Sequence, residues 1–168
     1  MLGLPVVDGV TVTHDLLSAL KAGLVDVPLL VQNMQCELDS LSPNKTIYDM
    51  SAAQYDTFLQ SYFSEHGWPA SAASVVSSLY AAEIAQSREL GYQAWFSDYS
   101  FGCGNIAVAL AAGAGFGSPV YLSRVTRGPD RPFQTFPFSE PSRFAGHMWD
   151  YIAGYIMHVL PFTCVIGS

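Results

Sequence analysis

The sequence predicts an α/β fold with a mainly parallel sheet flanked by helices. Two short segments have the composition of strands: Val25 to Val31 is almost continuously apolar, and Pro119 to Val125 is rich in β-branched and aromatic residues. Segments with apolar residues at helical spacing lie between them. Strand, helices and strand in this order are typical of the crossovers that join parallel strands, so we expect the two strands to be parallel neighbours.

The first helix is expected immediately before the first strand. From His14 to Ala22, leucines recur at helical spacing, and Gly23 stands where a left-handed residue ends a helix. The strand from Val25 to Val31 is almost continuously apolar, which is typical of a strand buried on both faces. This segment therefore predicts a helix, a turn and a buried strand.

Three further helices are expected between the strands. Ser51 can cap the first of them. The second begins after Pro69 and runs to about Leu90, where Gly91 ends it. The third includes Tyr92 to Tyr99. The apolar face of the first consists of Tyr55, Phe58, Leu59, Tyr62 and Phe63, and that of the second of Val76, Leu79, Tyr80 and Ile84.

Composition and charge restrict the class of protein. The 168 residues suffice for one domain, and we treat residues 1–168 as part of a single one. A formal net charge of −7 disfavours binding to nucleic acid or anionic lipid. Glycines and prolines interrupt the uncharged stretches 99–123 and 151–168, so we expect no membrane span. The N-terminus has no secretory signal, and the cellular location is left open.

Two residues have the surroundings of catalytic groups. His147 ends a long loop, directly before an expected helix with Asp150 in its first turn. Glu37 follows the first strand, at the edge of a parallel sheet where α/β proteins place their sites. A carboxylate and an imidazole together form the orienting half of a hydrolytic triad, in which the histidine takes the proton of a nucleophile.

Five short motifs, in this order and spacing, resemble type-B carboxylesterases and cholinesterase-like proteins over about residues 2–157. Residues 158–168 diverge from that family. The motifs are Leu4-Pro5-Val6-Val7-Asp8-Gly9, Asp26 to Val31 leading to Glu37, Ser97-Asp98 to Phe101-Gly102-Cys103, Pro119-Val120-Tyr121-Leu122, and Ala145-Gly146-His147.

The resemblance implies the C-terminal portion of an α/β-hydrolase fold that cleaves a small carboxylic ester without a cofactor. Glu37 matches the triad acid and His147 the general base, and the family's chain order is serine, acid, histidine. We expect the Glu37 carboxylate within hydrogen-bond reach of the His147 ring. The resemblance also makes Cys164 a candidate partner for Cys103, although we expect Cys103 to be a free buried thiol.

The chain departs from the family in several ways. It has neither a Gly-x-Ser-x-Gly elbow nor a His-Gly-Gly-Gly segment, so we expect residues 1–168 alone to be inactive and to pair with a missing N-terminal portion or with themselves. The usual glycines around the acid are absent, which leaves Asp39 as an alternative to Glu37. A non-catalytic protein-binding module and a truncated remnant are the alternative functions.

No metal or nucleotide site is expected. His14, His66 and His158 have no metal-ligand spacing. Gly113, Gly115 and Gly117 precede a strand instead of following one, which is the wrong order for a nucleotide-binding loop. We interpret these glycines as packing and turn residues.

Overall fold

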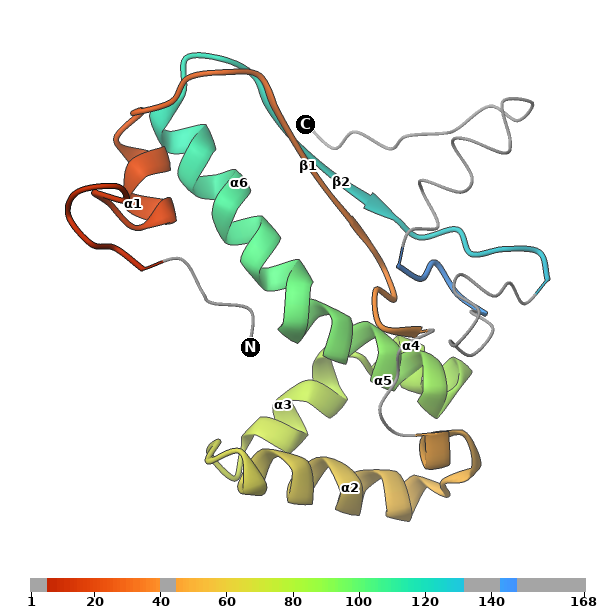
Figure 1. Cartoon of the computed structure of the whole chain (residues 1–168). Helices are drawn as coiled ribbons and strands as arrows, with labels where there is room; N and C mark the ends of the chain where they lie inside the picture. The colour runs from red at the N-terminus through yellow and green to blue at the C-terminus, as the bar shows by residue number, and fades with distance from the viewer. Residues whose placement is uncertain (1–5, 40–44, 132–142, 148–168) are drawn as a thin grey trace. The chain divides into compact units, whose positions relative to one another are not determined.

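The computed structural model describes residues 6–39, 45–131 and 143–147, and it has a mixed α/β architecture (Figure 1). The described chain divides into two compact units. The first unit contains residues 6–33 and 102–124. The second contains residues 34–39, 45–101, 125–131 and 143–147.

In the part of the chain that the structure describes, the sheet has two strands, β1 (Leu29–Met34) and β2 (Val120–Val125), which lie side by side in Figure 1. The Leu29 N–H donates to the Pro119 carbonyl at 3.0 Å, and the Gln35 N–H donates to the Val125 carbonyl at 2.9 Å. In both bonds the acceptor residue follows the donor residue by the same number of positions. This constant separation occurs only between parallel strands. The predicted parallel pairing is therefore confirmed.

The bounds and burial of β1 differ from the prediction. The strand begins at Leu29 instead of Val25, and its first ladder bond comes from the Leu29 N–H. Before this point the Gly117 and Ser118 N–H groups donate to the Asp26 side chain. The strand is not buried on both faces: exposure alternates along its first four residues, and Leu30 is 61% exposed. Within the described residues, β1 pairs with one other strand, and its faces are only partly covered. Exposure along β1 therefore alternates, as in a half-exposed strand.

In the first unit, α1 (Leu16–Lys21) packs against α6 (Cys103–Gly115). Asp15 caps α1 by accepting the Ser18 N–H at 3.0 Å, and Gly23 has the expected left-handed conformation with φ 63°. Gly115 lets the helices approach closely, because a Cβ there would lie 2.7 Å from the Lys21 carbonyl oxygen. The predicted packing role is therefore confirmed for Gly115 but is wrong for Gly113, which lies inside α6 and where a Cβ would meet nothing within 4 Å.

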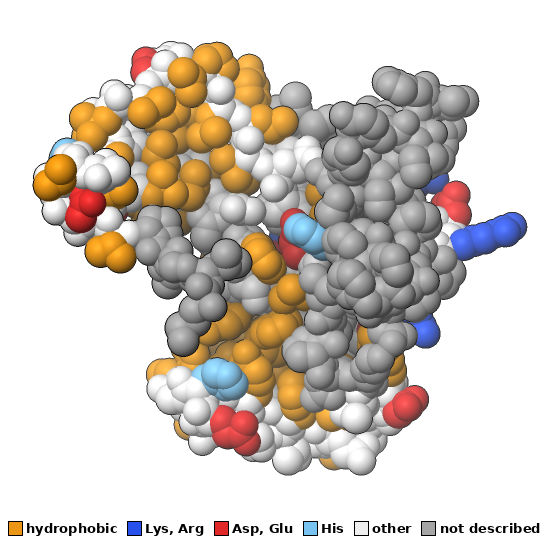
Figure 2. Space-filling model, viewed as in Figure 1, with side chains coloured by type: hydrophobic (Ala, Val, Ile, Leu, Met, Phe, Trp, Pro, Cys, Tyr) orange, Lys and Arg blue, Asp and Glu red, His pale blue; other side chains and the backbone are white. Residues whose placement is uncertain are grey.

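The helix α6 was not predicted from the sequence. Its buried hydrophobic residues are Ala109, Ala111 and Ala112, whereas Leu110 is 70% exposed. Figure 2 shows hydrophobic side chains gathered on the surface over α1 and α6. Cys103, at the start of α6, is exposed, which corrects the expectation of a buried thiol. Its candidate partner Cys164 lies outside the described residues.

In the second unit, α2 (Ala52–Glu65) begins at the predicted cap. The Ser51 hydroxyl accepts the Gln54 N–H at 3.3 Å, and the Gln54 side chain accepts the Ser51 N–H at 2.8 Å, which forms a capping box. A short 3₁₀ helix, η2 (Lys45–Asp49), precedes it. The buried core of this unit consists of Ile47, Tyr55, Leu59, Phe63, Ala73, Tyr92 and Trp95.

The long helix expected after Pro69 is wrong, because this region forms α3 (Ala72–Leu79), α4 (Ala81–Gln86) and α5 (Arg88–Ser97). The breaks come from the backbone. Ser87 is extended, at φ −161° and ψ 149°, and its hydroxyl caps α5 through the Leu90 N–H.

Gly91 does not end a helix but lies inside α5, where a Cβ would stand 3.1 Å from the Ile84 Cα. The glycine therefore serves the close packing of α4 on α5, and not the helix end that the sequence suggested. After α5 a π-helical turn, η3 (Asp98–Gly102), leads to α6. Within the described parts of the chain, every helix is too short or too polar to cross a bilayer.

Candidate active site

Glu37 lies in a turn just after the C-terminal end of β1. The turn is closed by the Asp39 N–H, which donates to the Cys36 carbonyl at 3.0 Å. One oxygen of Glu37, Oε1, accepts the Met34 N–H at 2.7 Å. The Glu37 side chain is only 11% exposed. A backbone donor therefore fixes the carboxylate at the end of the strand, where the sequence placed it.

His147 lies at the end of the described segment 143–147, in the same unit as Glu37. Its Nδ1 is 2.9 Å from Glu37 Oε2, so the contact expected between these residues is present. When Nδ1–H donates to the carboxylate, Nε2 keeps its lone pair and can accept a proton. The His147 side chain is 44% exposed, which gives a reactant access to it. The catalytic role of the pair stays a prediction.

Asp39, the alternative acid, has other partners. Its Oδ2 accepts the backbone N–H groups of Arg143 at 2.6 Å and of Phe144 at 3.0 Å, and the residue is 2% exposed. The Cys36 N–H donates to the Ala145 carbonyl at 3.0 Å. The two carboxylates therefore have different partners. Glu37 contacts the imidazole of His147, and Asp39 accepts hydrogen bonds from the backbone that precedes His147.

Two residues of a buried polar row on α5, which the sequence analysis missed, support the two segments, whereas the Gln93 side chain between them forms no hydrogen bond with the described residues. Glu89, Gln93 and Ser97 are spaced four residues apart, and each is at most 9% exposed. Glu89 Oε2 is 3.3 Å from Arg143 Nη1, and Ser97 Oγ accepts the Leu38 N–H at 3.3 Å. The signal was this spacing of polar residues within a largely apolar helix.

Burial raises the pKa of Glu89, and nearby Asp39 acts in the same direction, whereas the Arg143 guanidinium acts to lower it. The guanidinium also lies over the ring of Tyr48, with Arg143 Cζ 5.6 Å from the ring centroid. These contacts fix Arg143 from two directions. Asp150 and the helix expected after His147 lie outside the described residues.

The described residues show no nucleophile beside His147. No Gly-x-Ser-x-Gly occurs between Met1 and Ser168. Among the described residues, no serine or cysteine side chain forms a hydrogen bond with His147. The described residues of this arrangement can therefore orient an imidazole and accept a proton.

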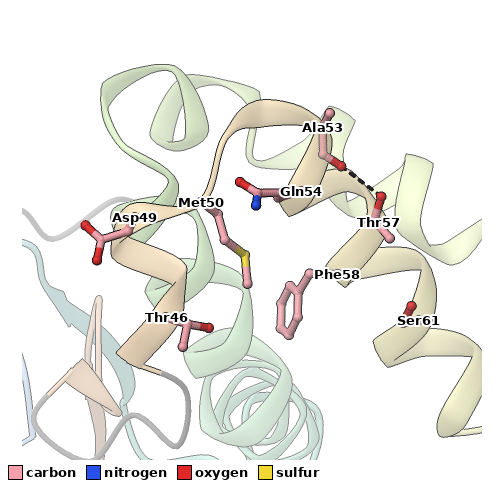
Figure 3. A pocket seen from close by; sticks show the side chains of 8 residues that line it. All are labelled: Thr46, Asp49, Met50, Ala53, Gln54, Thr57, Phe58 and Ser61. Carbon is pink, nitrogen blue, oxygen red and sulfur yellow. Dashed lines mark hydrogen bonds between the residues drawn. The ribbon is translucent and has the colours of Figure 1, made fainter.

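The hollow in Figure 3 does not belong to this site. Thr46, Asp49, Met50, Ala53, Gln54, Thr57, Phe58 and Ser61 line it, and they come from η2 and α2 and the residues between them. Its volume is about 620 Å³, and Met50 and Phe58 point into it (Figure 3). The Thr57 hydroxyl donates to the Ala53 carbonyl at 2.9 Å, within the helix. Neither Glu37 nor His147 contributes to the lining.

No protein-family model, no curated protein sequence and no solved structure matches the chain. The resemblance to type-B carboxylesterases therefore depends on the sequence motifs.

Proposed function

We propose that Glu37 and His147 are the acid and the general base of a Ser-Glu-His triad in a carboxylic ester hydrolase of the type-B carboxylesterase or cholinesterase-like family. In this proposal, residues 1–168 form the C-terminal portion of an α/β-hydrolase fold. The serine and the oxyanion donors belong to polypeptide other than these residues. The observation that carries the proposal is the 2.9 Å contact between Glu37 Oε2 and His147 Nδ1.

The chemistry of the contact supports this role. An acid on Nδ1 selects the tautomer in which Nε2 is the base, and it stabilises the imidazolium after proton transfer. Glu37 is fixed by the Met34 N–H and is nearly buried, whereas His147 is partly exposed. A nucleophile can therefore approach the imidazole while its acid stays shielded from water.

The fold is consistent with this placement. The acid follows the C-terminal end of a parallel strand, where α/β proteins gather their catalytic groups. Acid and histidine also occur in the chain order of α/β-hydrolases. These features support the family assignment without depending on the identity of the ester.

A non-catalytic binding module is the second candidate, and one observation favours it. In the first unit, Leu16, Leu30 and Leu110 are each more than 60% exposed. Exposed apolar side chains on this scale are typical of surfaces that bind another polypeptide. On the enzymatic proposal, the same surface packs against the serine-bearing portion or against a second copy of the chain.

The first test uses the purified chain of residues 1–168 with p-nitrophenyl acetate and butyrate. We expect no saturable turnover, because the nucleophile and the oxyanion donors are both missing, and the donors alone are worth about 10²–10³ in rate. The His147→Ala variant is the control. Saturable turnover that disappears in this variant would reveal a nucleophile within the chain and contradict the proposal.

The second test looks for the serine. The coding region upstream of Met1 is sequenced, and any in-frame segment with Gly-x-Ser-x-Gly is expressed together with residues 1–168. We expect ester hydrolysis that both Glu37→Gln and His147→Ala reduce by at least about 10³-fold. If no such segment is encoded, or if both variants keep full activity, the enzymatic proposal fails.

A further inference from the structure

We infer that Asp39 is a positioning residue, which holds the His147 segment against the Glu37 turn through the peptide groups of Arg143 and Phe144. The inference rests on the proposed function for its catalytic consequence. The structural part, the control of the His147 ring by Asp39, can be measured without an enzymatic assay.

The position of Asp39 links the two halves of the site. It closes the turn that contains Glu37, because its N–H donates to the Cys36 carbonyl. Its side chain reaches the other segment, where Oδ2 accepts two consecutive N–H groups, three and four residues before His147. Hydrogen bonds to a carboxylate are stronger than those between neutral groups, and here the acceptor is buried.

A backbone bond beside these contacts runs in the opposite direction. The Cys36 N–H donates to the Ala145 carbonyl, so the turn both donates to and accepts from the segment. Immediately before His147, the Gly146 N–H donates to the Phe144 carbonyl at 2.8 Å, which makes a tight turn. The direction of the His147 side chain therefore depends on backbone held by Asp39 and Cys36.

The Glu37 contact alone is a poor anchor for this segment. It is a single bond to a side chain that is 44% exposed, where water competes for the imidazole. Asp39 makes two bonds from a residue that is 2% exposed. Asp39 is therefore the stronger of these two side-chain anchors, and together with the Cys36 N–H it supports the backbone from which His147 reaches Glu37.

The helix α5 provides the fixed base for this arrangement. Ser97 holds the Leu38 N–H on one segment, and Glu89 holds the Arg143 guanidinium on the other. Both contacts are close to Asp39. Leu38 precedes Asp39 in the chain, and the Arg143 N–H donates to the Asp39 carboxylate. Asp39 joins the two segments through its side chain, beside the backbone bond from Cys36 to Ala145.

The experiment follows the His147 ring by NMR on the chain labelled with ¹⁵N-histidine, and His147→Gln assigns its signals. In the wild type, we expect one fixed Nδ1–H tautomer with a slowly exchanging proton. In Asp39→Asn, we expect this proton to exchange roughly five- to tenfold faster, as the loss of a hydrogen bond of ordinary strength predicts. Glu37→Gln, which changes the acceptor itself, should also accelerate the exchange.

Asp26→Asn is the matched control. Asp26 also accepts two consecutive N–H groups, those of Gly117 at 3.1 Å and Ser118 at 2.8 Å, but it lies in the first unit. Its replacement should leave the His147 signals unchanged. If Asp26→Asn and Asp39→Asn affect the ring equally, the effect is a general loss of structure and the inference is wrong.

A second variant covers the case in which Asp39→Asn does not fold. Replacing the peptide N–H of Phe144 with an ester oxygen removes one donor and leaves Asp39 in place. We expect the same acceleration of proton exchange at His147, and wild-type exchange in this variant would overturn the inference. Altered exchange with no ester hydrolysis in the co-expression test would instead contradict the proposed function alone.

Discussion

The two compact units bury different kinds of side chain. In the second unit, the fully buried residues include Trp95, Tyr55 and Leu59, and aromatic rings pack against one another. In the described part of the first unit, the buried hydrophobic residues are three alanines of α6, while its leucines are largely exposed. Large buried side chains stabilise the second unit. The first unit instead depends on the close packing of the α1 and α6 backbones.

The largest difference is expected from truncating one large apolar side chain in each unit. Trp95→Ala should lower the free energy of unfolding by about 3–5 kcal/mol, because it leaves a cavity in an aromatic core. Leu110→Ala should change it by less than about 0.5 kcal/mol, since the side chain is 70% exposed. Urea denaturation followed by circular dichroism measures both. Equal losses would show that the comparison between the units is wrong.

High pH should weaken the second unit through Tyr55. Burial raises the pKa of Tyr55 from 10.0 to about 12, while the Trp95 Nε1–H donates to its hydroxyl. The unfolded chain loses this proton above pH 10 and the folded chain does so only near pH 12, so stability falls as pH rises between these values. At 1.36 kcal/mol per pKa unit the loss is about 2.7 kcal/mol over the whole titration, and about 2 kcal/mol of it falls between pH 10 and pH 12.

Denaturation curves at pH 10 and pH 12 measure this loss, with Tyr55→Phe as the control. The phenylalanine variant has no hydroxyl at this position to ionise, so its stability should fall less over the same range. If both proteins lose the same stability, Tyr55 is not the group responsible.

A glycine pair in α6 tests close backbone approach in the first unit. Gly115→Ala should cost about 1–3 kcal/mol, because its Cβ would collide with the backbone carbonyls of Leu20 and Lys21. Gly113→Ala is the control in the same helix, where a Cβ meets nothing within 4 Å, and it should stabilise by up to about 1 kcal/mol. Thermal unfolding of both variants measures these changes. If both substitutions stabilise the protein, α1 does not approach α6 this closely.

The smallest effect is expected at Asp26 in the first unit. Hydrogen bonds from Ser118, and then from the Gly117 N–H, lower the pKa of Asp26 below 3.8. Its contribution to stability is therefore complete above pH 3.8 and is lost as pH falls through the lower folded value. The carboxylate is fully exposed, so the effect is modest. Hydrogen exchange at Gly117 and Ser118 should depend on pH in this range in the wild type and less so in Asp26→Asn.

Local sequence patterns predicted the elements that local chemistry defines. Ser51 and the apolar spacing after it predicted α2, and Gly23 predicted the end of α1. The break between α4 and α5 was missed because the apolar spacing continues past Ser87, whose extended backbone overrides it. The helix α6 was missed because alanine and glycine leave no amphipathic pattern, although alanine strongly favours a helix.

The candidate site could be predicted only in part. The pairing of Glu37 with His147 was expected from the family resemblance, because no local pattern links residues 110 positions apart. The contact of Asp39 with Arg143 spans 104 positions and joins a side chain to a backbone N–H. Any residue except proline offers such an N–H, so the residue types do not predict the contact. Sequence reasoning presented Asp39 as a rival of Glu37, whereas the geometry gives each carboxylate its own partner.

The sequence separation of these contacts also affects the order of folding. During synthesis at about 5–20 residues per second, Glu37 leaves the ribosome roughly 5–20 s before His147. Closing so long a loop costs entropy that only the final contacts repay, so contacts of high sequence separation form late. Until segment 143–147 arrives, the Glu37 and Asp39 carboxylates stay hydrated. The candidate site is then among the last parts of the second unit to assemble. Until it forms, its segments are accessible to a chaperone or a protease.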